Sequence, residues 1–408
     1  MKRLLVQTQL SNYDREGKFS LECDSGWQMV MGRVREVLKL RPDIYVDVMC
    51  PSVEQLITQP ETLNGVSDRV QYLRQTVVPD APVTRFDFDF RRTLTSVSAH
   101  KYDAVYINDP MHLRNFRAVF SKLGYTPRFT VHNHFVDCPS CPKFPTELSM
   151  WHGQCEAAIR ADFNFWQCGS AMRQFFRDMH KDYAGPAVSA AESKSESWDD
   201  GYSEEEVRSL DISNILFDVD NFHRRTRGKK LIFVPNRIGG RGRSDDYTNC
   251  GKFMFELLPE LRRIRHDFAV VAGNPNQKFS NAELEVECGE YGYINLVPAT
   301  LNRDEYKYIA THSDVVLALY GKDTYGGTAV RECVELGCRP LWLNCNEYAD
   351  LSAAAGYPFV VSPDFSDFTQ VLCALLDRGA DTERLLREVR RRCSYSSTTE
   401  CALLRMGL

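Results

Sequence analysis

The sequence lacks several features that would place a protein in a membrane or outside the cell. It has no run of about eighteen apolar residues, which a membrane-spanning helix needs. The first ten residues, MKRLLVQTQL, become polar too early for a signal peptide. The fourteen cysteines are scattered and do not follow the spacing of a disulfide framework. The protein is therefore expected to be cytoplasmic, with reduced cysteines and no stable membrane insertion.

An excess of positive charge is also missing. The chain has 50 Lys and Arg against 55 Asp and Glu, which gives a net charge of −5. A protein with this balance has no overall basic field for nucleic acid, although local basic segments can still follow a phosphate backbone. With 43% hydrophobic and 26% charged residues, a chain of 408 residues is long enough for two domains with ample cores.

Hydrophobic segments alternate with helical ones in both halves of the chain. This alternation predicts an α/β fold with two doubly wound, Rossmann-like domains facing a cleft. The expected strands are 3–9, 44–50, 83–88, 103–108 and 128–133, then 230–236, 267–273, 294–299, 314–320 and 339–344. The expected helices include 27–40, 250–264, 302–311 and 328–336. In such open parallel sheets, ligands bind beyond the carboxyl ends of the strands.

A change in composition marks the expected domain boundary. Residues 184–206, AGPAVSAAESKSESWDDGYSEEE, are small, polar and acidic, which is typical of a loop or linker. We therefore expect an N-terminal domain at 1–183, a linker or insert at 184–222 and a C-terminal domain at 223–385. A last helix at 386–408 is expected to pack back on the N-terminal domain.

Two glycines open a predicted helix in the second half. In KDTYGGTAVRECVELGCRPLWLN, Gly326 and Gly327 precede a helix that begins at Thr328, and Gly337 is suited to end it. The free backbone N–H groups and the dipole of such a helix start favour an anion. Glu332 lies in the second turn, so the glycines and the acid can face one ligand. The alternative is an ordinary loop–helix–strand unit with glycines in its turns.

A cationic segment follows the first strand of the second half. The stretch HRRTRGKKLIFVPNRIGGRGR contains arginines and lysines but no acid. Arg237, Arg241 and Arg243 come directly after the strand, and the glycines between them let a phosphate approach the backbone. We expect a diphosphate to bind between this loop and the helix that follows Gly326 and Gly327. Glu332 would accept hydrogen bonds from the ribose hydroxyls. A solvated basic face is the alternative, and it suits Arg224–Lys230 better than the later arginines.

The stretch VHNHFVDCPSCPKF combines two histidines with a CxxC pair. Cys138 and Cys141 could bind zinc together with His132 or His134. A structural zinc site generally needs two such pairs, and a proline-bounded loop with reduced cysteines is the alternative. We therefore assign no metal site to this sequence.

Together these features resemble the two-domain (GT-B) nucleotide-sugar glycosyltransferases of the retaining, glycogen-synthase-like type. The matching segments of the second half are Arg237 after its strand, VVAG (270–273) and SDVVLALYGKDTYGGTAVRECVELGCRPL (313–341). The first half is similar more weakly, through KYDAVYIND (101–109), FTVHNHF (129–135) and IRADFNFWQCGSAMRQFF (159–176). The resemblance implies transfer of a sugar from a nucleotide-sugar, expected to be a UDP-sugar, to an acceptor hydroxyl with retention of configuration.

The resemblance also implies which residues form the site. Preplaced cations stabilise the leaving diphosphate, and a histidine at a strand end faces the transferred sugar, so no metal or other cofactor is expected. The expected catalytic residues are His132, His134, Arg237 and Lys252. The expected donor-binding residues are Arg237, Arg241, Arg243, Gly273, Asp323, Gly326, Gly327, Thr328 and Glu332.

The sequence departs from the family pattern at two positions. Thr324 holds the first position of the family's acid pair, and Asp323 lies one residue early. The lysine that follows the first arginine in the family is absent, which leaves Arg241, Arg243 or Lys252 to take its role.

The acceptor is expected to contact the N-terminal domain. A short similarity to phage enzymes that glycosylate hydroxymethylated DNA bases favours a modified pyrimidine in DNA, and the setting would then be the host cytoplasm. The expected acceptor-binding residues are Asn12, Arg15, Arg114 and Arg117. One alternative is a glycan or small-molecule acceptor in surface polysaccharide synthesis. Another is a non-catalytic protein that binds a sugar nucleotide or nucleic acid, and the oligomeric state is not predicted.

Overall fold

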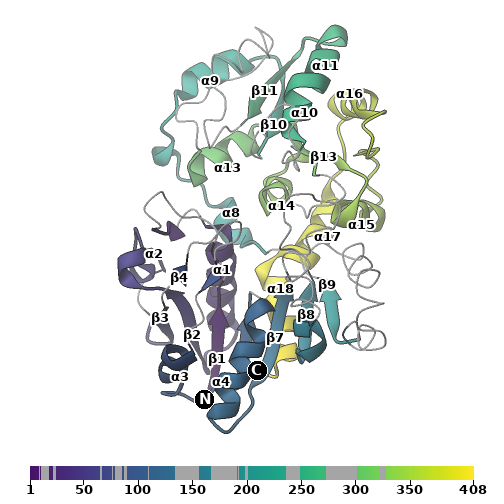
Figure 1. The fold of residues 1–408 in the computed structure, drawn as a ribbon. Coiled ribbons are helices and arrows are strands. Elements are labelled where there is room, and N and C mark those ends of the chain that lie inside the picture. Colours follow the sequence, from purple (N-terminus) through teal and green to yellow (C-terminus); the bar gives the residue numbers. More distant parts are fainter. Residues whose placement is uncertain are drawn as a thin grey trace. The chain divides into compact units, whose positions relative to one another are not determined.

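Buried apolar strands organise the chain into two parallel sheets, one in each of two units (Figure 1). Unit 1 comprises residues 1–136, 144–201 and 394–408, and unit 2 comprises 137–143 and 202–393. The computed structural model describes residues 1–8, 10, 18–21, 24–64, 67–75, 77–78, 85–86, 90–108, 110–133, 156–166, 191, 193–197, 201–235, 249–272, 301–320 and 328–408. The predicted α/β fold with two Rossmann-like domains is confirmed.

Unit 1 contains a seven-stranded parallel sheet in the order β3-β2-β1-β6-β7-β8-β9. Its strands are β1 (Lys2–Gln7), β2 (Ile44–Pro51), β3 (Val70–Gln75), β6 (Ala104–Ile107), β7 (Arg128–Asn133), β8 (Phe163–Trp166) and β9 (Ser195–Ser197). The short strands β4 (Val77–Val78) and β5 (Arg85–Phe86) form a separate antiparallel pair. The helices include α1 (Ser25–Leu40), η2 (Val53–Gln55), α2 (Pro60–Asn64), α3 (Phe90–Val97), η3 (Pro110–His112), α4 (Leu113–Lys122) and α18 (Tyr395–Met406).

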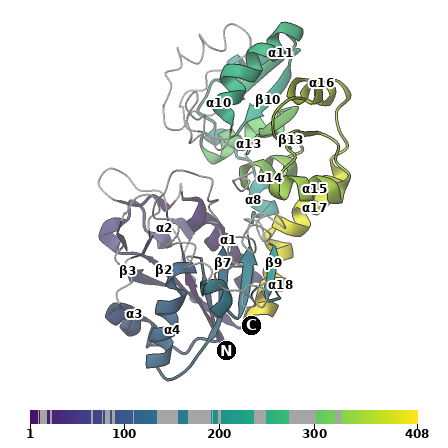
Figure 2. The same cartoon turned by 45° about the vertical axis from the view of Figure 1, so that its right-hand side comes forward.

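Alternate residues of β1 divide the core of unit 1 into two layers. Leu4 and Val6 pack with α1 and α18, whereas Leu5 packs with α3 and α4. Helices α1 and α18 contact each other closely (Figure 2). A Cβ atom at Gly32 would lie 2.2 Å from the Tyr395 ring, so only glycine allows the two helices to approach this far.

The structure corrects the sequence-based prediction for residues 184–206. These residues are predicted to be a loop or linker, yet Ser195–Ser197 form β9, which pairs in parallel with β8. A three-residue polar strand at a sheet edge has no hydrophobic alternation, so its pattern could not reveal it. The boundary between the units falls at Gly201 and Tyr202, and the chain returns to unit 1 at Ser394.

Unit 2 contains a five-stranded parallel sheet in the order β11-β10-β12-β13-β14. Its strands are β10 (Lys230–Val234), β11 (Phe268–Ala272), β12 (Val315–Ala318), β13 (Arg339–Leu343) and β14 (Val360–Val361). Its helices include α8 (Glu204–Arg208), η4 (Ile212–Asn214), α9 (Val219–Thr226), α10 (Cys250–Lys252), the π-helical η5 (Phe253–Leu257), α11 (Leu258–Ile264), α13 (Arg303–Thr311), α14 (Thr328–Glu335), α15 (Asn346–Ala355), α16 (Phe368–Arg378) and α17 (Glu383–Cys393). The predicted strand at 294–299 lies outside the described residues.

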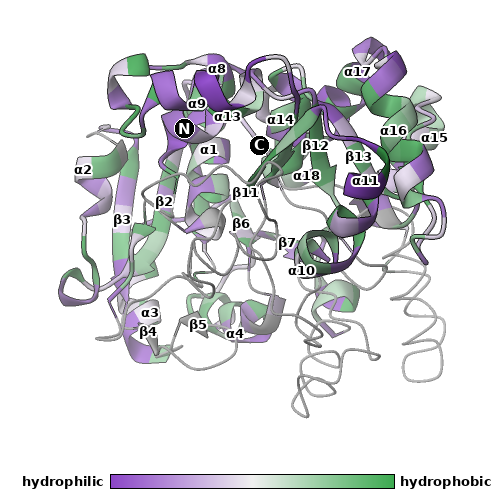
Figure 3. Ribbon diagram, turned by 90° about the horizontal axis from the view of Figure 1, so that it is seen from above, coloured by the Kyte–Doolittle hydropathy of each residue, from purple (hydrophilic) through white to green (hydrophobic). Residues whose placement is uncertain are grey.

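The strands of unit 2 are covered on both faces. Leu231 and Phe233 of β10 belong to one core cluster, and Ile232 and Val234 belong to the other. Strands β12 and β13 are accordingly hydrophobic along most of their length (Figure 3). In such helix–strand units, the helix N-termini gather at the carboxyl edge of the sheet and the helix C-termini gather at the amino edge.

Candidate functional site

The carboxyl edge of the unit 2 sheet is the edge at which open parallel sheets bind ligands. Asn249, directly before α10, donates from Nδ2 to the carbonyl of Leu319, one residue after β12, at 2.6 Å. Its φ angle of 51° lies in the left-handed region, which asparagine tolerates better than most residues. Cys345, after β13, donates to the Tyr320 carbonyl at 3.5 Å. These contacts join the ends of β12 and β13 to the start of α10.

Glu332, in the second turn of α14, forms a two-pronged ion pair with Arg303. Arg303 Nη1 lies 2.7 Å from Oε2 of Glu332, and Nη2 lies 2.5 Å from Oε1. The Glu332 side chain is 7% exposed, whereas that of Arg303 is 52% exposed. Burial lowers the pKa of Arg303, but the hydrogen bonds and charge of Glu332 raise it above its ordinary value. The carboxylate therefore lies below the surface with a charged partner that reaches solvent.

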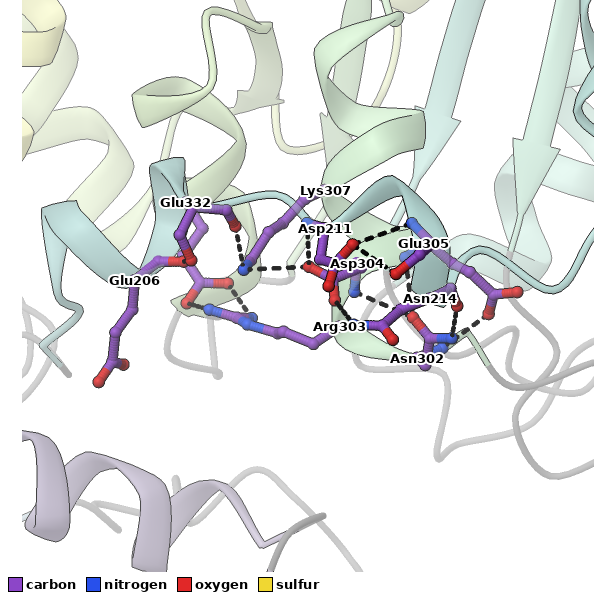
Figure 4. A network of polar contacts seen from close by, with 11 residues as sticks. Glu206, Asp211, Asn214, Asn302, Arg303, Asp304, Glu305, Lys307 and Glu332 are labelled. Carbon is purple, nitrogen blue, oxygen red and sulfur yellow. Dashed lines mark hydrogen bonds and ion pairs between the residues drawn. The ribbon is translucent and has the colours of Figure 1, made fainter. Parts of the chain in front are cut away.

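Arg303 owes its position to the tightly held start of α13 (Figure 4). Asn302 caps the helix, and its side chain accepts from the backbone of Asp304 and Glu305 while the Glu305 carboxylate accepts from the Asn302 backbone. The Asp304 carboxylate accepts from the Asn214 side chain at 2.8 Å. Further hydrogen bonds join this helix start to the segment 209–216. A capping box of this kind fixes the first helical residue, which is Arg303.

Tyr306 connects α13 to α14 beneath the ion pair. Its hydroxyl donates to the carbonyl of Ala329 and lies 3.0 Å from the Cys333 sulfur. The Arg303 guanidinium lies 5.7 Å from the centre of the Tyr306 ring. Burial raises the pKa of the Cys333 thiol well above its ordinary value, so this thiol stays protonated and is not a nucleophile. The two helices that carry the ion pair are thus fixed to each other.

Two other charged side chains of α14 are buried and pair with residues of neighbouring helices in unit 2. Arg331 donates to Glu347 of α15, and both side chains are fully buried. Glu335 is also fully buried, and its carboxylate accepts from Tyr202, Arg208 and Arg390. These two groups hold α8, α15 and α17 against α14.

Most of the predicted donor-binding residues lie outside the described residues. These are Arg237, Arg241, Arg243, Gly273, Asp323, Gly326 and Gly327. The same is true of His134, Asn12, Arg15 and the CxxC pair Cys138 and Cys141. Thr328 is the first residue of α14 and is partly buried, so it lies one turn before Glu332.

Lys252 lies in α10, one turn from the carboxyl edge. Its Nζ is 3.7 Å from Glu256 Oε2 and 4.9 Å from the centre of the Phe365 ring. Its predicted role at the diphosphate stays a prediction.

His132 lies inside unit 1, in the second-last position of β7. Its side chain is 0% exposed, and Nδ1 is 2.7 Å from the Tyr106 hydroxyl. The ring also meets the edge of Phe165 on the neighbouring strand. This burial gives His132 a packing role, and its predicted contact with a sugar stays a prediction.

The two predicted acceptor residues of α4 differ in their surroundings. Arg114 is exposed on the helix. Arg117 is half-buried; it donates to the Arg160 carbonyl at 2.9 Å, and its guanidinium lies over the Phe129 ring. The contacts of Arg117 are explained by the packing of unit 1, so Arg114 is the better residue for testing an acceptor surface.

Solved structures share the fold along the whole length of the chain. A UDP-forming α,α-trehalose-phosphate synthase from Burkholderia xenovorans is 13% identical with a TM-score of 0.60, and the match covers 100% of this chain and 99% of that one. HepE from Anabaena, in complex with UDP, is 11% identical with a TM-score of 0.61 and 100% coverage of both chains. The likeness establishes the fold. In sequence, neither a family model nor a curated protein matches the chain.

Sequence reasoning predicts Glu332 as a donor-binding residue, which stays a prediction, but it missed its partner Arg303. The signal was present, because Asn302 and Glu305 have the spacing of a capping box and so mark Arg303 as the first residue of a helix at the carboxyl edge. Within the described ranges, no three His, Cys, Asp or Glu side chains are placed to hold a metal ion. No helix in the same ranges is long and apolar enough to cross a membrane.

Proposed function

We propose that this protein is a glycosyltransferase that moves a sugar from a UDP-sugar to an acceptor hydroxyl. The observation that carries the proposal is Glu332, a buried carboxylate at the carboxyl edge whose partner Arg303 is half-exposed. The fold likeness adds support, because the HepE structures contain UDP, UDP with glucose, or UDP-glucose.

The geometry around Glu332 suits a ribose. Each carboxylate oxygen accepts one N–H from Arg303, and each oxygen has a second lone pair for a ribose hydroxyl. Arg303 also balances the charge of the carboxylate, which lowers the cost of its burial before a ligand is bound. We therefore assign Glu332 to ribose binding and Arg303 to the positioning of Glu332.

The proposed chemistry needs cations at the departing group. The bond between the anomeric carbon and the diphosphate oxygen breaks, and its electron pair leaves with the diphosphate. Arg237, with Arg241, Arg243 or Lys252, would stabilise this charge together with the N–H groups at the start of α14. The acceptor oxygen bonds to the anomeric carbon as its hydroxyl loses a proton. Retention of configuration is part of the proposal and follows from the family resemblance.

For the acceptor we propose a hydroxymethylated pyrimidine in DNA. The exposed Arg114 in α4 supports this choice, since a phosphate backbone needs accessible cations. A small glycan acceptor is the second candidate, because trehalose-phosphate synthases share the fold. Mass spectrometry of products formed from UDP- and GDP-sugars with each acceptor class would decide between them.

Donor hydrolysis without acceptor tests the enzyme itself. Wild-type protein is expected to bind UDP in calorimetry and to release UDP slowly from its donor sugar nucleotide. Arg237→Ala should lose most of this release, while Arg384→Ala, an exposed cation in α17, should leave it unchanged. Protein that binds UDP but neither hydrolyses nor transfers any sugar would be a binding protein instead.

A further inference from the structure

The amino edge of the unit 2 sheet carries a concentration of positive charge. Four of the connections that lead there from a helix end into a strand carry charge: 223–230 into β10, 262–267 into β11, 311–314 into β12 and 337–339 into β13. Together they contain nine arginines and lysines, three histidines, two aspartates and no glutamate. Because the whole chain has a net charge of −5, this basic edge differs in sign from the rest of the protein.

The four connections form one continuous surface. The backbone N–H of Lys230 donates to the Asp267 carbonyl at 2.7 Å, which joins the first connection to the second. The Asp314 N–H donates to the Leu231 carbonyl at 2.8 Å, which joins the third to the first. Val315 is in register with Arg339 across β12 and β13, so the fourth connection lies beside the third. The charges are therefore neighbours in space as well as in sequence.

Local acids balance only part of this charge. Lys230 and Arg339 share Asp314, and Arg265 pairs with Asp267 and Asp377. Cations in the last turns of α9 and α11 also offset the negative ends of those helices.

Three exposed cations of the basic edge have no acid that balances them. Among the described residues, Arg227, Lys229 and Arg263 form no side-chain hydrogen bond or ion pair. Lys229 lies two residues beyond Arg227, the C-cap of α9, so the helix dipole does not account for it. Exposed cations without partners at such density attract an extended anion rather than a single one.

Two histidines add hydrogen-bonding groups beside these cations. His223 Nε2 is 2.7 Å from the Tyr308 hydroxyl, and the His312 ring lies 4.3 Å from the Tyr308 ring. Both imidazoles are exposed. The surface thus offers ring N–H donors as well as charge to phosphate oxygens.

We infer that the basic edge binds the phosphate backbone of a nucleic-acid duplex. Two of the three exposed cations without a partner, Arg227 and Arg263, are arginines, which bind phosphate with two parallel hydrogen bonds. An anionic lipid surface fits less well, because only one of the exposed large hydrophobic residues identified in the structure, Ile264, lies on this edge. The basic edge is at the opposite end of the strands from Glu332, so a duplex there does not compete with the proposed sugar nucleotide. The inference is independent of glycosyl transfer.

Salt-dependent binding to an unmodified DNA duplex tests this inference. Fluorescence anisotropy with a labelled duplex of about 30 base pairs should show binding at about 50 mM salt. Each phosphate contact contributes about 0.9 to the slope of log affinity against log salt, so three contacts weaken binding about 40-fold by about 200 mM. A variant with Arg227→Ala, Lys229→Ala and Arg263→Ala should have a slope flatter by about 2.7.

A matched variant removes the same charge elsewhere on the chain. Lys39→Ala, Arg91→Ala and Arg384→Ala change three exposed cations outside the basic edge and should leave the slope unchanged. No binding at low salt, or equal losses in both triple variants, would overturn the inference. Binding to phosphatidylserine vesicles but not to the duplex would also overturn it and identify a lipid surface instead.

Donor hydrolysis separates this inference from the proposed function. Both triple variants should hydrolyse the donor at the wild-type rate and melt near the wild-type temperature. If wild type binds the duplex with the expected salt slope but has no activity on any sugar nucleotide, the proposed glycosyltransferase function is wrong. The inference that the basic edge binds a duplex is then still supported.

Discussion

Two carboxylates of α14, Glu332 and Glu335, lie three residues apart and have opposite surroundings. Both side chains are buried, yet within the described part of the chain Glu332 has one cationic partner, Arg303. Glu335 is enclosed by Tyr202, by Arg208 and by Arg390, and these contacts use both of its oxygens. Burial alone therefore does not distinguish the acid that we propose for ribose from the one that holds helices together. The difference lies in the number of donors: each Glu335 oxygen accepts from two described side chains, whereas each Glu332 oxygen accepts from one.

The largest effect is expected from the third charged side chain of the helix, Arg331. Arg331→Ala removes the cation that faces the buried Glu347, and an uncompensated buried charge costs about 3–5 kcal/mol of unfolding free energy. Denaturant unfolding would measure the loss. Arg331→Met combined with Glu347→Leu should recover most of it, because no charge is then left in the core. A single-variant loss below about 1 kcal/mol would show that the pair contributes little.

A smaller loss of stability is expected from Glu335→Ala. The change removes an acid that holds three partners, but Arg208 and Arg390 are 55% and 32% exposed and can turn to water. The unfolding free energy should fall by about 2–3 kcal/mol. UDP-sugar affinity, measured by calorimetry on the folded variant, should stay at the wild-type value. A loss of affinity as large as that of Glu332→Ala would remove the distinction between the two acids.

Glu332→Ala, in contrast, should lower the affinity of the protein for the sugar nucleotide. Loss of charge-assisted hydrogen bonds to ribose is expected to cost about 1.5–3 kcal/mol of binding free energy, or about 10- to 150-fold in affinity. Glu332→Gln keeps the shape of the side chain and should fall between wild type and the alanine variant. Unchanged affinity for UDP-sugars in a folded Glu332→Ala protein would falsify the assignment to ribose.

The smallest effect is expected from the partner, Arg303. Because Arg303→Ala leaves the buried Glu332 carboxylate without its cation, the unfolding free energy should fall by about 1–3 kcal/mol, and the effect that is smallest is the one on donor binding. Donor affinity should fall less than in Glu332→Ala, because Arg303 orients the Glu332 carboxylate but is not itself assigned a contact with the ribose. Arg303→Lys should restore part of that affinity. A greater loss of affinity in Arg303→Ala than in Glu332→Ala would mean that the arginine itself contacts the donor.

The sequence predicted the layers of the fold better than the environments of single side chains. The strand expected at 128–133 is β7, and the helix expected at 250–264 is the run α10, η5 and α11. Hydrophobic periodicity carries this information locally. The short strand β9 was missed because polar residues at a sheet edge lack that periodicity.

At the candidate site, too, local sequence periodicity does not predict the surroundings of single side chains. Glu332 and Glu335 look alike in sequence, since each has an apolar neighbour, Cys333 or Val334, in the same helix. What separates them is a partner 29 residues away for the first and others at 55 and 133 residues for the second. Long-range pairing of this kind depends on the packing of α13, α17 and the segment around Tyr202. The local sequence pattern therefore does not predict which side chains form these pairs.

The contact between Gly32 and Tyr395 has a consequence for synthesis of the protein. The chain enters unit 2 at Tyr202 and leaves it at Cys393, and the Tyr202 N–H donates to the Cys393 carbonyl at 3.1 Å. Unit 2 is thus almost wholly an insertion into unit 1, with its two ends side by side. Because α18 follows unit 2 in the chain and covers α1, unit 1 cannot close its core until unit 2 and α18 have been synthesised. A nascent chain therefore carries an exposed apolar face on α1 throughout the synthesis of unit 2, and a truncation at Ser394 would leave it exposed permanently.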